Sequence, residues 1–279
     1  MMKITEQTID EFKKYLIKSE KSQATVEKYI HDTAVFKKWL DEREADKDII
    51  LEYKEHLKSV YAPVSVNAVI SSLNSLFRFK GWQELTLKTL KIQKKLFSGS
   101  DREMKLNEYK SLLNAAKKSG KSRIRLIIQT MFVTGIRISE LKYITVHAIE
   151  CGTAVIDCKG KVREVFIPKD MCNILKKYVW DNGIKSGSVF VTRTGNPIDR
   201  SNISKAMKKI AGLAKVAKEK VFPHNLRHLF ARVYYSTYKD IVRLADILGH
   251  SSVNTTRIYT MESGSVHRRQ IEKLGLTFC

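Results

Sequence analysis

The sequence has few of the residues that cross-link a chain or interrupt its regular structure. Its 279 residues include only four cysteines, four prolines and 13 glycines. The cysteines, Cys151, Cys158, Cys172 and Cys279, form no CxxC pair and have no zinc-ligand spacing. We therefore expect them to be reduced and structural, and we expect no metal site.

Long apolar runs are also missing. No run approaches the roughly 18 residues that a membrane-spanning helix needs. The first six residues lack the apolar stretch of a signal peptide. We therefore expect a cytoplasmic, nucleoid-associated protein with no membrane partner.

Acidic residues are scarce relative to basic ones. Lys and Arg total 51 against 29 Asp and Glu, which gives a net charge of +22. Residues 1–100 carry 18 basic and 14 acidic residues (+4), so residues 101–279 carry the remaining 33 and 15 (+18). A solubilising surface is also charged, but an excess of one sign on this scale favours a polyanionic partner such as DNA.

Apolar residues recur at helical spacing through the first 90 residues, which predicts helices over 9–17, 22–40, 49–57 and from Pro63 to 77. We expect residues 1–90 to form a helical DNA-binding domain. Residues 91–102 contain Ser98-Gly99-Ser100 and are typical of a linker, although a plain surface loop has the same composition. Six basic residues of these segments are candidate DNA contacts: Lys13, Lys14, Arg78, Lys80, Lys94 and Lys95.

The remainder of the chain predicts further helices and a single hairpin. Helices are expected over 106–118, 126–134, 138–144, 172–179, 201–217, 224–236 and 241–248, with Gly135 ending the second of them. Strands 153–158 and 163–168 would flank a polar turn at 159–162. The predicted fold class is mainly α with a small β-sheet (α+β).

A set of polar residues in this part suggests one chemistry. His224 and Arg227 are spaced i and i+3, so they share one face of a helix beginning near Pro223. Tyr259 lies nine residues beyond His250. The other members of the set precede them: Arg137 after a Thr-Gly helix end, and Lys159 and Lys161 on the hairpin turn.

This set matches what phosphodiester cleavage needs when no metal takes part. A tyrosine can act as the nucleophile, and arginines stabilise charge that develops on the phosphate. Histidine and lysine can accept and donate the protons. No acidic cluster indicates Mg²⁺ and no Gly-rich loop indicates ATP, so we expect no cofactor.

Taken singly, each of these residues has a plain structural explanation. The pattern H-x-x-R is common, and a lone tyrosine on a helix is usually a core residue. We assign Tyr234, Tyr235 and Tyr238 to packing, and His228 to a structural hydrogen bond. The other histidines, His31, His56, His147 and His267, are also taken as structural.

In order and spacing, four motifs together resemble the tyrosine recombinase (phage integrase) family. They are Thr134-Gly135-Ile136-Arg137-Ile138-Ser139-Glu140-Leu141, Pro223-His224-Asn225-Leu226-Arg227-His228, Leu248-Gly249-His250-Ser251-Ser252 and Thr256-Arg257-Ile258-Tyr259-Thr260. The resemblance covers essentially the whole chain. Residues 22–40 are similar to the family's core-binding domain, and residues 103–262 to its catalytic domain. The resemblance implies a C-shaped clamp around DNA.

The resemblance also implies residue roles. Tyr259 would form a 3′-phosphotyrosyl link and leave a free 5′-hydroxyl. Arg137 and Arg227 would hold the non-bridging oxygens, and His250 would hydrogen-bond the phosphate. The remaining roles are proton transfer at the tyrosine for His224, protonation of the 5′ oxygen for Lys159 (with Lys161 as the alternative), and support of Arg137 for Glu140.

Some features depart from the family pattern. The hairpin turn is short, which leaves the lysine ambiguous. Leu229 stands where a small hydroxyl residue is frequent, which affects packing. No segment precedes the core-binding helices, so we expect no additional N-terminal domain. Residues 263–279 would form a tail that docks on a neighbouring subunit, giving a homotetramer on DNA; a tail folded back on its own domain is the alternative.

The sequence thus predicts a site-specific recombinase, an integrase of a mobile element, that acts on double-stranded DNA and can work with an accessory directionality factor. Two alternatives stay open. A type IB topoisomerase uses the same residues, although the short N-terminal domain favours a recombinase. A DNA-binding protein that has lost catalysis is the other.

Overall fold

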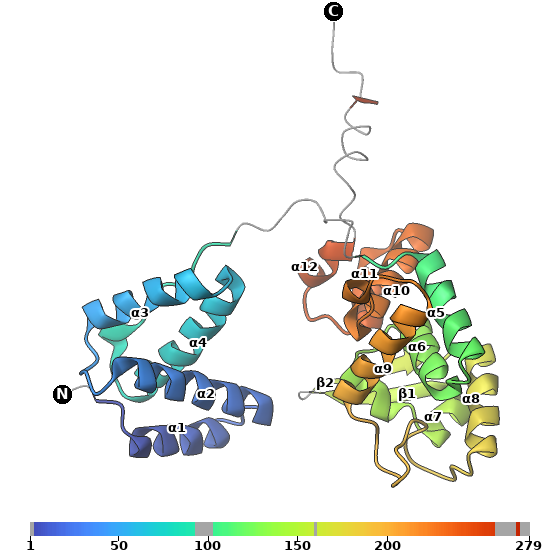
Figure 1. Ribbon diagram of the computed structural model, residues 1–279, viewed down its shortest axis with the longest axis horizontal. Coiled ribbons are helices and arrows are strands. Elements are labelled where there is room, and N and C mark those ends of the chain that lie inside the picture. Colours follow the sequence, from blue (N-terminus) through green and yellow to red (C-terminus); the bar gives the residue numbers. More distant parts are fainter. Residues whose placement is uncertain (1–2, 93–102, 159–160, 260–271, 274–279) are drawn as a thin grey trace, which may run out of the picture. The chain divides into compact units, whose positions relative to one another are not determined.

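The chain folds into two compact units, Met1–Lys94 and Lys95–Cys279 (Figure 1). The computed structural model describes residues 3–92, 103–158, 161–259 and 272–273. Each unit has its own apolar core. The predicted fold class, mainly helical with one small sheet, is confirmed. The predicted linker at 91–102 lies largely outside the described residues, as do Lys94 and Lys95.

The first unit is a small bundle of helices. Side chains of Thr5, Ser22 and Asp46 each accept a hydrogen bond from a backbone N–H of the first turn, and Pro63 begins the fourth helix, so local sequence sets all four starts. Its core includes the fully buried Phe12 and Phe36. The elements are α1 (Glu6–Lys18), α2 (Gln23–Leu40), α3 (Lys47–Val60), α4 (Pro63–Phe79) and the 3₁₀ helix η1 (Gln83–Leu85).

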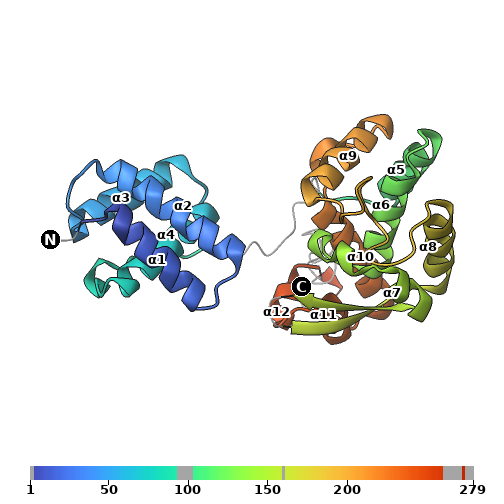
Figure 2. The same ribbon diagram turned by 90° about the horizontal axis from the view of Figure 1, so that it is seen from below.

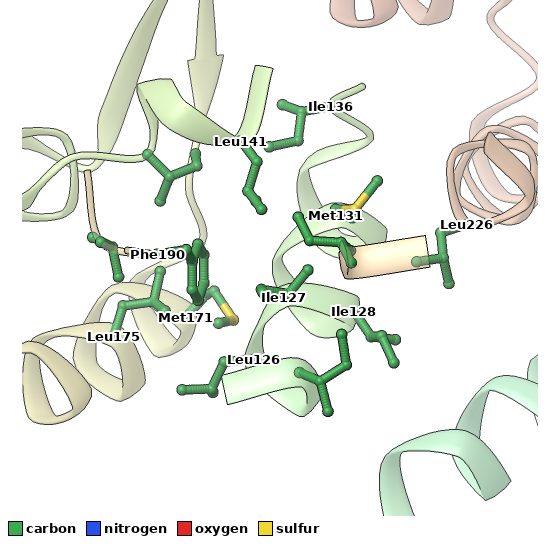
Figure 3. Packing of buried hydrophobic residues seen from close by; sticks show 14 of the residues in the cluster. Leu126, Ile127, Ile128, Met131, Ile136, Leu141, Met171, Leu175, Phe190 and Leu226 are labelled. Carbon is green, nitrogen blue, oxygen red and sulfur yellow. The ribbon is translucent and has the colours of Figure 1, made fainter. Parts of the chain in front are cut away.

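The second unit is built around one buried helix, α6 (Ser122–Thr134), which packs against α5 (Leu106–Lys118), which precedes it in the chain, and against α9 (Arg200–Leu213) and α10 (Pro223–Tyr238), which come much later (Figure 2). Ile127, Ile128 and Met131 of this helix meet Leu226, Met171 and Phe190 in a continuous apolar core (Figure 3). The other helices are α7 (Val146–Cys151), α8 (Lys169–Asp181), α11 (Ile241–Leu248) and α12 (Val253–Thr256).

The hairpin is present, with a shorter turn than predicted. Strand β1 (Thr153–Cys158) pairs antiparallel with β2 (Lys161–Phe166), and Cys158 is opposite Lys161. The second strand therefore begins at Lys161, so the predicted four-residue turn at 159–162 is wrong. Residues 159 and 160, including Lys159, lie outside the described residues. The side chain of Lys161 is likewise not among the described ones.

Three other expectations differ from the structure. Residues Ile138–Tyr143 form a 3₁₀ helix, η3, in place of an α-helix, with backbone bonds that span three residues, such as that from the Glu140 N–H to the Arg137 carbonyl (2.9 Å). Helix α7 was not predicted, since its six residues are too few to give a periodic pattern. Helix α9 ends at Leu213 and not at 217, because the chain turns through Lys215, which has a positive φ.

Two expected absences concern the described residues only. No described helix is long and apolar enough to cross a bilayer. No group of three or more metal-binding side chains occurs in the part of the chain that the structure describes. Of the cysteines, Cys172 is buried, as expected of a structural residue, whereas Cys151 is exposed beside His147, 3.6 Å from its Nε2.

Candidate active site

Arg137 is placed by the end of helix α6. Gly135 ends that helix in the left-handed conformation (φ 63°), and the chain then turns into η3. Glu140 accepts hydrogen bonds from the Arg137 backbone N–H (2.8 Å) and from its Nη1 (3.0 Å). The Glu140 side chain is 1% exposed and that of Arg137 is 40% exposed. A buried carboxylate therefore orients a cation that solvent and a ligand can reach.

A second arginine binds the same carboxylate. Arg163, on strand β2, donates from Nη2 to Oε2 of Glu140 at 2.7 Å. Its Nη1 donates to the backbone carbonyl of Ile247 at 2.6 Å. Nothing in the sequence distinguishes this arginine from other strand residues, and it was not predicted as a site residue.

Arg227 is buried without a carboxylate partner. It is 1% exposed and donates to the carbonyls of Gly135 (2.7 Å) and Leu248 (2.6 Å). Its Nε has no hydrogen-bond partner among the described residues. Burial, then the charge of Arg137, lower its pKa to about 10, so it stays cationic at neutral pH. A buried cation in this state is costly unless an anion reaches it, which suits a phosphate site.

His250 follows the C-cap Gly249 of α11 and is held in one protonation state. Its Nε2 lies 3.0 Å from Nη2 of Arg227, and its Nδ1 lies 2.9 Å from the hydroxyl of Thr256. Because a guanidinium can only donate, Nε2 must accept, and we assign the imidazole proton to Nδ1. This agrees with the pKa, which burial and then Arg227 lower to about 4.

Tyr259 is the last of the expected site residues in sequence order. It lies in the 3₁₀ helix η5 (Arg257–Tyr259), is 5% exposed and packs on a small apolar cluster that includes Leu244 and Leu248. Burial raises the pKa of its hydroxyl, while a hydrogen bond with Arg227 and the charge of that arginine lower it. The tyrosine is therefore neutral, with its hydroxyl beside the buried cation.

Two histidines complete the group. His224, in the first turn of α10, has its ring 4.5 Å from the ring of His228, which packs edge-on against Tyr259 at 4.8 Å. Burial, followed by Arg227 and Arg137, lowers the pKa of His224. The pKa of His228 falls to about 4, mainly through burial and then through His224. His228, expected to be structural, thus contacts the candidate nucleophile directly.

The structure therefore brings most of the predicted residues together: Arg137, Glu140, His224, Arg227, His250 and Tyr259. The predicted lysine stays a prediction, because Lys159 and the side chain of Lys161 lie outside the described residues. Sequence reasoning missed Arg163, the contact of His228 with Tyr259, and Thr256. The second of these had a weak signal, since His228 is four residues after His224 on one helix face.

In the first unit, the predicted DNA contacts differ in how free they are. Lys13, Lys14 and Arg78 are exposed. Lys80 is partly buried, with its Nζ 3.7 Å from Glu11 and 5.9 Å from the ring centre of Trp82. Within the described residues none of these three forms an ion pair, although Nε of Arg78 donates to the Asn74 carbonyl at 3.0 Å.

Fold and site together define an enzyme that breaks and rejoins DNA strands through a tyrosine. Comparison with known families agrees. Residues 102–264 match the phage integrase family, and residues 9–84 match the phage integrase N-terminal SAM-like domain. The chain belongs to the phage integrase family, whose members are tyrosine recombinases.

Individual relatives have the same enzyme type. The tyrosine recombinase XerA of Thermococcus kodakarensis is 30% identical over 280 residues, covering 97% of this chain and 96% of the relative. XerH of Campylobacter jejuni is 38% identical over 153 residues, covering 53% of this chain and 43% of the relative.

Solved structures share the fold. XerH bound to its difH substrate in a pre-cleavage complex has a TM-score of 0.71 at 21% identity, covering 91% of this chain and 82% of that one. A lambda integrase tetramer bound to a Holliday junction has a TM-score of 0.72 at 18% identity, covering 91% and 76%.

Proposed function

We propose that this protein is a site-specific DNA recombinase, an integrase of a mobile element, that cuts and rejoins DNA through a 3′-phosphotyrosyl intermediate at Tyr259. The observation that carries the proposal is the buried Arg227. Its Nε has no hydrogen-bond partner within the described part of the chain, and Arg137, His250 and Tyr259 lie near its guanidinium. This arrangement offers an anion several donors and a nucleophile at one point.

Cleavage proceeds as a transesterification. The Tyr259 oxygen attacks the scissile phosphorus, and its proton passes to His224. The P–O5′ bond breaks, and the leaving 5′ oxygen takes a proton from the hairpin lysine, Lys159 or alternatively Lys161. Arg137 and Arg227 hold the non-bridging oxygens. Religation is the reverse attack by a 5′-hydroxyl, so no outside energy source is needed.

His250 changes partner when the phosphate arrives. Its Nε2 accepts from Arg227 in the DNA-free protein, so to donate to a phosphate oxygen it must carry a proton, either in the Nε2–H tautomer, with the Thr256 hydroxyl donating to Nδ1, or in the protonated imidazolium. The negative phosphate favours that protonated form. Glu140 keeps Arg137 oriented through both steps.

The partners follow from the same proposal. The specific recombination site is double-stranded DNA, which is contacted by a core-binding domain (1–90) and by a catalytic domain (103–262), with residues 91–102 as the linker. We also propose that residues 263–279, which lie outside the described residues except for 272–273, dock on a neighbouring subunit in a homotetramer. The DNA-bound tetramer of the structurally similar lambda integrase supports this assembly. An accessory directionality factor and a nucleoid location complete the proposal.

A suicide-substrate assay tests the nucleophile. Nicked duplexes from DNA flanking the gene are incubated with wild type, Tyr259→Phe and Tyr238→Phe, and the products are separated on a denaturing gel. Tyr238 is a matched control, because it is an exposed tyrosine at the end of α10. We expect a covalent band with wild type and Tyr238→Phe only. A band that survives in Tyr259→Phe would mean that another residue attacks the phosphate.

A further inference from the structure

Arg163 connects two elements of the candidate active site, η3 and the end of α11. Its guanidinium binds Glu140 on one side and the Ile247 carbonyl on the other, and its side chain is 15% exposed. The backbone of Arg163 belongs to β2, two residues after Lys161 and four after Lys159. One side chain thus connects the lysine-bearing hairpin to two other elements.

Both acceptors support phosphate-binding groups. Glu140 holds Arg137 through two hydrogen bonds. Ile247 immediately precedes Leu248, whose carbonyl holds Arg227. Arg163 therefore links the hairpin to Glu140, which holds Arg137, and to the end of α11, which holds Arg227.

Gly249 leaves room for this connection. A Cβ placed on Gly249 would lie 2.4 Å from Cδ and 2.6 Å from Nε of Arg163, far inside van der Waals contact. The backbone there also has a φ of 64°, which favours glycine. The stem of Arg163 therefore packs directly against the turn that presents His250.

We propose that Arg163 is a positioning residue that fixes the β-hairpin, and the general-acid lysine on it, relative to the bound phosphate. The inference rests on the proposed function, since it assumes that a hairpin lysine protonates the leaving oxygen. Proton transfer requires placement within hydrogen-bond reach, and small displacements slow it strongly. A lysine at 163 retains the charge but lacks the planar fork that reaches both acceptors at once.

The test separates leaving-group protonation from phosphate binding. Suicide substrates carry either oxygen or sulfur at the bridging 5′ position of the scissile phosphate. When the tyrosine oxygen bonds to phosphorus and the P–S bond breaks, sulfur leaves as a thiolate, a weak base that needs no proton. We expect Arg163→Ala to cleave the oxygen substrate about 100-fold more slowly, the lower end of what general acid catalysis contributes. On the sulfur substrate it should cleave within about 3-fold of wild type, because the proton step is bypassed.

Two outcomes would overturn the inference. An equal loss on both substrates would assign Arg163 to phosphate binding or to folding, and no loss on either would remove its role. Arg163→Lys guards against a folding defect in the alanine variant, and it should show a smaller, but again oxygen-specific, loss. Arg123→Ala is the matched control, since it removes an arginine that donates to a distant carbonyl, that of Val191 at 2.9 Å, away from the hairpin.

Tyr259→Phe distinguishes failure of this inference from failure of the proposed function. It should form no covalent product with either substrate. If it does, the nucleophile has been misassigned, whatever the Arg163 variants do. If it does not, and the Arg163 variants show no preference for sulfur, only the positioning role is lost.

Discussion

The residues around Tyr259 differ in how burial affects their charge. Arg227 is a cation at neutral pH despite full burial. His228 and His250 are neutral, because burial and the neighbouring arginines disfavour a further positive charge. The DNA-free site thus has fixed positive charges on arginine and neutral imidazoles beside them. An anion that binds there is stabilised by the arginine charges. Its negative charge in turn favours protonation of a neighbouring histidine.

This charge distribution predicts a pH dependence of stability. The pKa values of His228 and His250 are about 4 in the folded protein, below their ordinary value of 6.5. Below pH 6.5 the unfolded chain therefore binds protons that the folded protein excludes, and the free energy of unfolding falls as the pH drops from 6.5 towards 4. Urea unfolding of the DNA-free protein at pH 7, 6 and 5 should show a falling midpoint.

Two variants check the assignment. His228→Asn should make the fall in midpoint shallower, because it removes one of the histidines whose pKa is lowered in the folded protein; His224 and His250 remain. His147→Asn, at an exposed histidine of α7, should leave the slope unchanged. A midpoint that does not vary between pH 7 and 5 in wild type would contradict the burial of these rings.

At the level of elements, the ends of helices position the site. The αL turn at Gly135 ends α6 and presents the carbonyl that accepts from Arg227. The similar turn at Gly249 ends α11 and precedes His250. Local sequence therefore determines where each helix ends. The end of α6 places the Gly135 carbonyl in the site, and the end of α11 places His250 there. Side-chain bonds from Arg163 and Arg227 then connect these ends.

Replacement of Gly135 by alanine tests this element. Its φ of 63° is unfavourable for alanine by roughly 1–2 kcal/mol. Its Cβ would also lie 2.5 Å from Cδ1 of Phe230, an overlap of the kind that costs about 1–3 kcal/mol. We expect Gly135→Ala to lose about 2–5 kcal/mol of unfolding free energy, measured by urea titration, and to cleave more slowly because the Arg227 acceptor moves.

Gly152→Ala is the control for that variant. Gly152 caps α7 with a φ of 75°, but a Cβ there meets nothing within 4 Å. It should show only the backbone penalty and normal cleavage. If both variants lose equal stability, contact with Phe230 does not matter, and the glycine is required by its backbone conformation alone.

At the level of the whole molecule, the feature that matters most for DNA affinity is the positive net charge. The net charge is +22, and residues 101–279 contribute most of it. Each unit has a separate core, so each can present its basic surface independently of the packing of the other. Affinity for DNA should then come largely from phosphate contacts, which release counterions and make binding depend on salt.

We therefore expect the affinity of Tyr259→Phe for duplex DNA to fall steeply between 50 and 200 mM salt, by about 1000-fold or more if six or more phosphates are contacted. This variant keeps the measurement free of covalent trapping. Adding Lys13→Ala and Lys14→Ala should reduce the slope of log K against log salt by up to about 2. Lys54→Ala, at a lysine whose Nζ binds the Lys88 carbonyl at 2.8 Å, should leave the slope unchanged. An affinity that is insensitive to salt would contradict the basic DNA surface.

The sequence by itself determined the helical class, the hairpin, the basic bias and the identity of the polar residues that gather at the site. These features depend on periodicity, on glycine and proline at helix ends, and on spacing along one helix, all of which act over a few residues. The order of the motifs was sufficient to indicate the family. It was not sufficient to fix the hairpin register, because a turn of two or of four residues fits the same local composition.

Only the tertiary structure decided which charges are buried and what they contact. Arg227 is buried because α6 and α11 end against it, and its acceptors are 92 and 21 residues away in the chain. Arg163 reaches Ile247 across 84 residues, and no local pattern encodes such a bond. His228 gains its contact with Tyr259 in the same way. Burial and long-range hydrogen bonds set the protonation of a site, and they exist only once the helices have packed.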